Sequence, residues 1–211
     1  MCWSAQADLV MGAGVSGLGV VCLGAVRDRR QLPLAALPLV LGVHQLVEAV
    51  VWLGEEGRIG PGLARSAGVG WALIAMPLLA LLVPVGAWRA AGRPRRLVGF
   101  VAIGLVTAVV LTLAVLGGPV TAEVRGHTLE YAVGVPFAPV FLTTYLLAVL
   151  GPLVLNPVPE LRLLGWSVAV AAGVCALLWR TAFVSTWCAL AALASVLLLR
   201  WLRRPSSEPE R

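Results

Sequence analysis

The stretch LGVHQLVEAVVWL, residues 41–53, places polar side chains in an apolar segment, residues 32–53, that is long enough to cross a membrane. His44 and Glu48 are four residues apart, so on a helix both point to the same side, with Gln45 next to His44. An ionisable side chain in hydrocarbon costs at least about 2.5 kcal/mol, so it normally faces other helices, has a partner or serves a function. The sequence therefore predicts a polar site within this segment.

The composition is typical of an integral membrane protein. Of the 211 residues, 60% are hydrophobic and only 12% are charged, whereas about 25% of the residues in a soluble domain are charged. The mean hydropathy is +0.94. The apolar residues form long runs, which indicates a single transmembrane domain, residues 1–202, in the plasma membrane with the lipid bilayer as its partner. Every basic residue is Arg and borders an apolar run, so we expect no nucleic-acid partner.

We predict an all-α fold, a bundle of seven transmembrane helices. The apolar run 163–199 is too long for one crossing, so we expect it to turn back near Arg180. Pro33 and Pro38 predict a bend in the second span. Residues 203–211 are predicted to form a disordered cytoplasmic tail. The predicted spans are residues 9–26, 32–53, 69–88, 97–116, 131–155, 163–179 and 184–202.

The arginines predict the orientation of the bundle. With the N-terminus outside and the C-terminus inside, twelve of the sixteen arginines lie on the cytoplasmic side, as the positive-inside rule requires. The tryptophans then all lie near span ends, where their amphipathic rings are enriched. The four arginines expected outside are Arg58, Arg65, Arg125 and Arg180.

This orientation gathers the candidate site residues in the outer half of the protein. They are His44, Gln45, Glu48, Arg125, His127 and Arg180. The simplest interpretation is a helix-packing network in which Glu48 pairs with Arg180 or accepts hydrogen bonds, because buried polar groups need partners.

Besides the helix-packing network, there are two functional interpretations of these residues. His44, Glu48 and His127 are the ligand types of an open catalytic zinc site, which would make the chain a metal-dependent membrane hydrolase. Alternatively, His44 and Glu48 titrate in a small proton-coupled transporter or sensor. The sequence contains no HExxH, no CxxC pair and no acidic cluster, which favours a non-enzymatic protein without a cofactor. No span contains the Lys that a retinal Schiff base needs.

Cys2 and Cys188 are candidates for a disulfide. Both are predicted at the outer boundary of the membrane, next to Trp3 and Trp187, where the compartment allows disulfides to persist. A bridge would join the first and last helices of the bundle. Two free thiols are the alternative, since pairing requires Cα atoms within about 7 Å.

Four segments carry a resemblance to a known group of proteins: MCWSA, RDRRQLPLAALPLVLGVHQLVEAVVW, AEVRGHTLEY and FVSTWCALAALASV. With these motifs the chain resembles an uncharacterised family of actinobacterial multi-pass membrane proteins. The resemblance covers most of the chain. It implies a membrane location and no particular activity.

Overall fold

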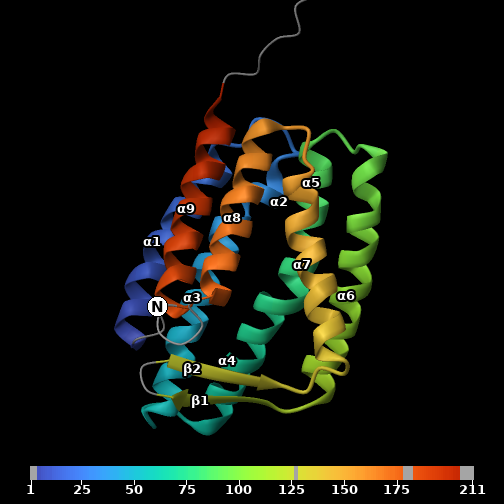
Figure 1. Cartoon of the computed structure of the whole chain (residues 1–211). Coiled ribbons are helices and arrows are strands. Elements are labelled where there is room, and N and C mark those ends of the chain that lie inside the picture. The colour runs from blue at the N-terminus through green and yellow to red at the C-terminus, as the bar shows by residue number, and fades with distance from the viewer. Residues whose placement is uncertain (1–3, 126–127, 178–182, 205–211) are drawn as a thin grey trace, which may run out of the picture.

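The structure is a computed structural model, and it describes residues 4–125, 128–177 and 183–204. The chain forms a bundle of long helices with a β-hairpin across one end (Figure 1). In chain order the elements are α1 (Ala5–Gly24), α2 (Leu32–Ala35), α3 (Leu37–Glu55), α4 (Pro61–Leu73), the π-helix η1 (Ile74–Leu78), α5 (Leu79–Ala90), the 3-10 helix η2 (Arg95–Leu97), α6 (Val98–Gly117), β1 (Val120–Arg125), β2 (Thr128–Val133), α7 (Ala138–Val154), α8 (Pro159–Leu177) and α9 (Phe183–Arg203).

Proline residues divide the second helical segment as the sequence predicts. Pro33 lies in the first turn of α2 and Pro38 in the first turn of α3. A proline in a first turn is tolerated because its missing N–H has no intrahelical acceptor there. The two helices meet at Ala36, and the polar stretch follows in the uninterrupted part of α3.

The third helical segment is longer than predicted. It begins at Pro61, inside residues expected to form a loop, and runs through α4, η1 and α5 to Ala90. Proline at the first helical position favours this early start. Pro77 lies inside the π-helical turn of η1. A wider turn accommodates a proline that cannot donate its own hydrogen bond.

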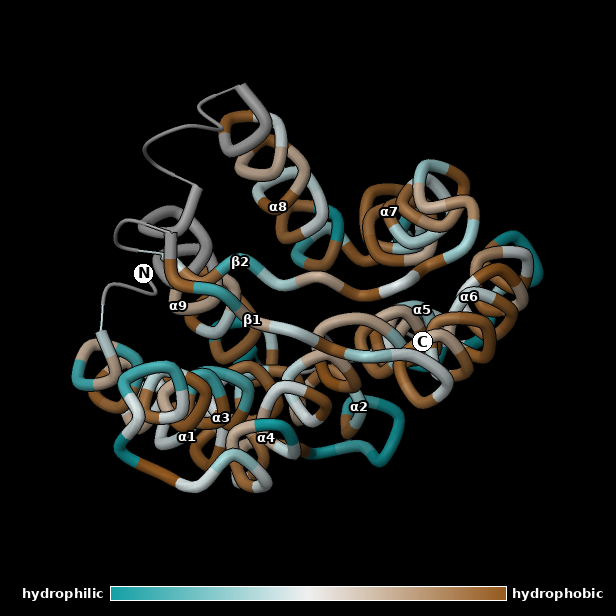
Figure 2. The backbone as a smooth tube through the Cα atoms, turned by 90° about the horizontal axis from the view of Figure 1, so that it is seen from below, coloured by the Kyte–Doolittle hydropathy of each residue, from teal (hydrophilic) through white to brown (hydrophobic). Residues whose placement is uncertain are grey.

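A β-hairpin corrects the prediction of an all-α fold. Strands β1 and β2 pair antiparallel, with Glu123 opposite Glu130 and Arg125 opposite Thr128. Strand β1 alternates apolar and polar residues along its length, a pattern with the period of a strand, and β2 does so over its first three residues. The predicted fifth span, 131–155, is therefore wrong at its beginning, because its first residues belong to β2. Seen from this end, the hairpin runs between α1, α3 and α4 on one side and α7 and α8 on the other (Figure 2).

The number of candidate spans also differs from the seven predicted. Within the described part of the chain, four helical segments are long and apolar enough to cross a membrane. Helix α7 has 17 residues because the hairpin takes the start of the predicted span. Helices α8 and α9 flank residues 178–182, which lie outside the description, as do residues 205–211 of the predicted tail. The four candidate spans are Ala5–Gly24, Leu32–Glu55, Pro61–Ala90 and Arg95–Gly117.

Small residues allow α1 and α3 to pack closely. A Cβ atom added at Gly42 of α3 would lie 2.3 Å from the Ser16 hydroxyl oxygen of α1. One added at Gly19 of α1 would lie 2.4 Å from the backbone nitrogen of Leu39. Side chains at these positions would force the helices apart, so the glycines set the distance between the two backbones.

Candidate functional site

Helix α3 carries a stripe of buried polar residues. His44, Gln45 and Glu48 are all buried, and Glu48 exposes only 5% of its surface. Trp52, one turn further along the same stripe, is buried as well. The four-residue spacing from His44 to Glu48 to Trp52 places these side chains on one face of α3.

Asp8 of α1 joins this stripe, which the sequence analysis did not predict. Its side chain is completely buried, at 0% exposure. The carboxylate interacts electrostatically with that of Glu48. It also interacts with the indole N–H of Trp52, although that contact does not reach hydrogen-bond geometry. Two acidic side chains from two helices therefore lie within electrostatic range of each other inside the bundle.

The local sequence contains a signal that could have revealed Asp8. The hydroxyl of Ser4 accepts a hydrogen bond from the backbone N–H of Ala7 at 3.2 Å and caps α1. Ser is a preferred N-cap residue, and an acidic residue is favoured in the first turn that follows. The predicted first span begins at residue 9 and therefore leaves Asp8 outside it.

An aromatic wall closes the other side of the stripe. Trp71 of α4 stacks on Tyr131 of β2, with ring centroids 3.5 Å apart and planes only 6° from parallel. The His44 ring lies 5.1 Å from that of Trp71. The Tyr131 hydroxyl donates to a carboxylate oxygen of Glu48 at 3.5 Å, the outer limit for a hydrogen bond. The hairpin thus forms one wall of the site. We refer to Asp8, His44, Gln45, Glu48, Trp52, Trp71 and Tyr131 as the polar cluster.

Several polar atoms of the polar cluster have no hydrogen-bond partner among the described residues. They are both carboxylate oxygens of Asp8, Nε2 of His44, Oε1 of Gln45, and Nε1 of Trp52 and Trp71. Leaving such atoms unsatisfied in an apolar interior costs about 1–3 kcal/mol for each group. The arrangement therefore offers acceptors and an imidazole to a small polar or cationic species.

The remaining predicted site residues fall largely outside the description. Arg125 ends β1, where its backbone pairs with Thr128, but its side chain is not described. His127 and Arg180 lie in the ranges 126–127 and 178–182, which the structure does not describe. The predicted pairing of Glu48 with Arg180 therefore stays a prediction.

Residues of the predicted metal site and of the predicted disulfide also lie outside the described ranges. Residues 4–125, 128–177 and 183–204 contain no group of three or more His, Cys, Asp or Glu side chains arranged to hold a metal ion. His127, the third proposed zinc ligand, is outside those ranges. Cys2 also lies outside them, and the side chain of Cys188 is not described. Cys22, which is described, is a free and buried thiol.

Comparison with known proteins identifies a family without assigning an activity. No curated protein and no solved structure matches the chain. A model of a family of unknown function, DUF6629, matches residues 1–211. The match spans the hairpin and the helices that carry the polar cluster. The chain belongs to the family of unknown function DUF6629.

Proposed function

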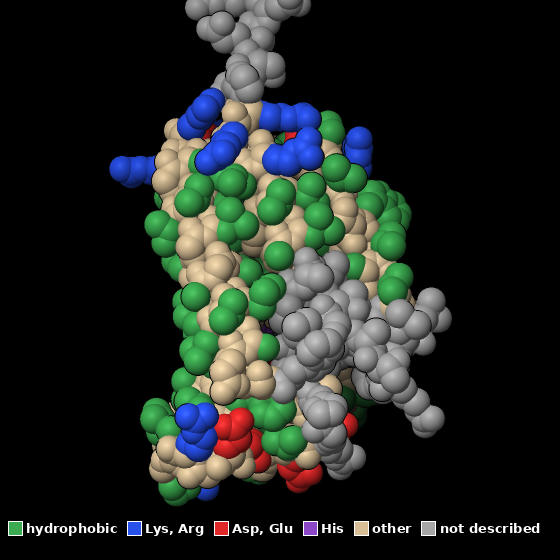
Figure 3. Space-filling view, turned by 90° about the vertical axis from the view of Figure 1, so that its left-hand side faces the viewer, with side chains coloured by type: hydrophobic (Ala, Val, Ile, Leu, Met, Phe, Trp, Pro, Cys, Tyr) green, Lys and Arg blue, Asp and Glu red, His purple; other side chains and the backbone are tan. Residues whose placement is uncertain are grey.

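We propose that the chain is a multi-pass plasma-membrane protein whose polar cluster exchanges protons with the outer side of the membrane, as the coupling site of a small carrier or a sensor. Charge distribution supports the orientation. Most of the basic side chains lie at the end where α9 finishes, whereas the opposite, hairpin end carries acidic side chains together with a few basic ones (Figure 3). Under the positive-inside rule the arginine-rich end is cytoplasmic.

The polar cluster is shallow in the membrane in this orientation. Asp8 lies in the first turn of α1, whose N-terminal end is on the hairpin side. Glu48 precedes the last residue of α3 by seven residues, which corresponds to about 10 Å along a helix axis. A proton from the outer aqueous phase therefore has a short path to both carboxyl groups. The arginine-rich end of the bundle is much farther from them.

The observation that carries the proposal is the burial of Asp8 beside Glu48. Burial removes both carboxylates from water and the two also repel each other, and a proton is the smallest cation that relieves both effects. The titratable side chains that face the pair within the described residues are His44 of α3 and Tyr131 of β2. All four groups can take part in binding and releasing a proton.

Infrared difference spectroscopy of the full chain in detergent tests this proposal. A protonated carboxylic acid has a carbonyl band that an ionised carboxylate lacks, so a pH change should produce such a band from the polar cluster. We expect the band to be lost in Asp8→Asn and altered in Glu48→Gln. Asp28→Asn is the matched control, because Asp28 is an exposed carboxylate near Arg30 in the loop after α1.

Two results would contradict the proposal. A band that is the same in wild type and Asp8→Asn would show that Asp8 does not exchange the proton. Zinc bound at one equivalent per chain, and lost in His44→Ala, would favour the metal-dependent hydrolase instead.

A further inference from the structure

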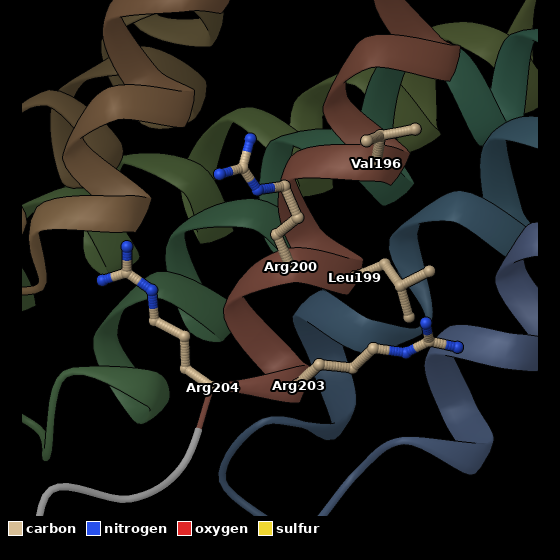
Figure 4. Close-up of a pocket in the computed structure, with 5 residues that line it drawn as sticks. All are labelled: Val196, Leu199, Arg200, Arg203 and Arg204. Carbon is tan, nitrogen blue, oxygen red and sulfur yellow. The ribbon is translucent and has the colours of Figure 1, made fainter.

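A shallow groove lies at the arginine-rich end of the bundle, far from the polar cluster. It has a volume of about 330 Å³ and is lined by the last turns of α9 and the residue that follows the helix: Val196, Leu199, Arg200, Arg203 and Arg204 (Figure 4). The groove therefore has three guanidinium groups and an apolar wall. We infer that this groove binds the phosphate headgroup of an anionic phospholipid of the cytoplasmic leaflet.

The charges of the groove are largely available to a ligand. Arg200 and Arg203 are exposed, and neither forms an ion pair with a residue in the described part of the chain. Arg204 pairs with Glu160 of α8, and its carbonyl oxygen accepts a hydrogen bond from the Arg27 side chain at 3.4 Å. Arg27 thus adds a fourth positive charge at the edge of the groove. A guanidinium group can form two parallel N–H···O hydrogen bonds with one phosphate group, which suits this ligand.

The surface of α9 above the groove is apolar. Leu193 and Val196 each expose 47% of their surface. Leu193, Val196, Arg200 and Arg203 follow one another at intervals of three or four residues, so they share one face of α9. A hydrocarbon chain can lie along the two apolar residues while the phosphate rests on the two arginines. This order, from apolar to cationic along one helix face, matches the shape of a phospholipid at the membrane surface.

The site fits a lipid better than a soluble anion. Clusters of basic residues at the cytoplasmic end of a membrane helix bind anionic lipid headgroups. A free phosphate would use the arginines but not the apolar wall of Val196 and Leu199. The volume of the groove, near the lower limit for ligand sites, suits a headgroup with the acyl chains left outside. The inference requires the membrane orientation proposed above, but it does not depend on proton exchange by the polar cluster.

Binding of phosphatidylglycerol and phosphatidylcholine with identical acyl chains to the detergent-solubilised full chain tests this inference. We expect tighter binding of phosphatidylglycerol, measured by native mass spectrometry and by the shift of thermal unfolding. Arg200→Gln with Arg203→Gln should weaken phosphatidylglycerol binding about 30-fold, the effect of two arginine contacts at a membrane surface. Binding of phosphatidylcholine should not change.

Two further variants test whether the lipid binds to the groove itself or to the positive charge of the surface in general. Arg95→Gln with Arg96→Gln removes the same charge from exposed residues at the same end of the bundle, outside the groove, and should retain binding. Val196→Trp fills the apolar wall without changing any charge and should weaken binding of the lipid. Equal binding of the two lipids, or equal losses in the two arginine pairs, would overturn the inference. Inorganic phosphate that displaces the lipid completely would show a site for a free anion instead.

Discussion

Replacement of Gly42 by Ala tests the close contact between α1 and α3. The added Cβ atom would lie 2.3 Å from Oγ of Ser16 and 2.4 Å from its backbone nitrogen. Ordinary van der Waals contacts of a Cβ atom begin at 3.4 Å. The Ser16 hydroxyl can rotate away, but its backbone nitrogen cannot. Helix α1 must therefore move about 1 Å away from α3.

The expected loss of stability is the difference between two effects. Overpacking that forces a backbone to shift costs about 1–3 kcal/mol. Alanine is the better helix former, by about 0.5–1 kcal/mol. We therefore expect Gly42→Ala to lower the free energy of unfolding by about 1 kcal/mol, the difference between the middle values of these two estimates.

Thermal unfolding of the detergent-solubilised chain measures this loss. Gly17→Ala is the matched control, because a Cβ atom added at Gly17 of α1 meets nothing within 4 Å. That variant should be as stable as wild type or slightly more stable. If Gly42→Ala and Gly17→Ala unfold at the same temperature, the close approach of α1 and α3 is not needed and the packing argument fails.

Three further predictions concern the polar cluster, its predicted partner Arg180 and the cysteines. Tyr131→Phe keeps the aromatic stack and removes a long hydrogen bond to Glu48, so it should cost less than about 1 kcal/mol in unfolding free energy, measured by thermal denaturation. If Glu48 pairs with Arg180, then Glu48→Gln and Arg180→Ala should each destabilise the protein and the double variant should lose less than their sum; strict additivity in that cycle would rule the pair out. Thiol labelling of unfolded, non-reduced protein should find two reactive thiols if Cys2 and Cys188 are bonded and four if they are not.

Features set by local chemistry could be predicted from the sequence. Prolines interrupt a helix through their own geometry, so Pro33 and Pro38 mark the break before α3. Helical spacing is also local, and it places His44 and Glu48 on one face of α3. The length and hydropathy of the runs predict a mostly helical chain with membrane-length helices, of which the described residues contain four.

Features that depend on distant residues could not be predicted in the same way. Tyr131 and Glu48 are 83 residues apart in the chain, and only the folded hairpin brings them together. The strands of that hairpin are short and follow a long apolar helix, and β2 ends on apolar residues, so the sequence predicts a loop and the start of a span there. To predict the burial of Asp8, one would have to know both the exact start of α1 and the residue of α3 that lies next to Asp8. The ends of helices are the least reliable part of a sequence prediction.

The close packing of α1 and α3 also determines where Asp8 lies in the polar cluster and how deeply it is buried. Asp8 and Gly12 are one turn apart on α1, so they share the face that meets α3. A Cβ atom added at Gly12 would lie 2.9 Å from the Leu46 side chain, within the stretch that carries His44 and Glu48. The glycine face therefore brings the Asp8 carboxylate against Glu48 and leaves its two oxygens fully buried. Wider spacing of these helices would let water reach the pair, which would solvate the carboxylates and screen the repulsion between them.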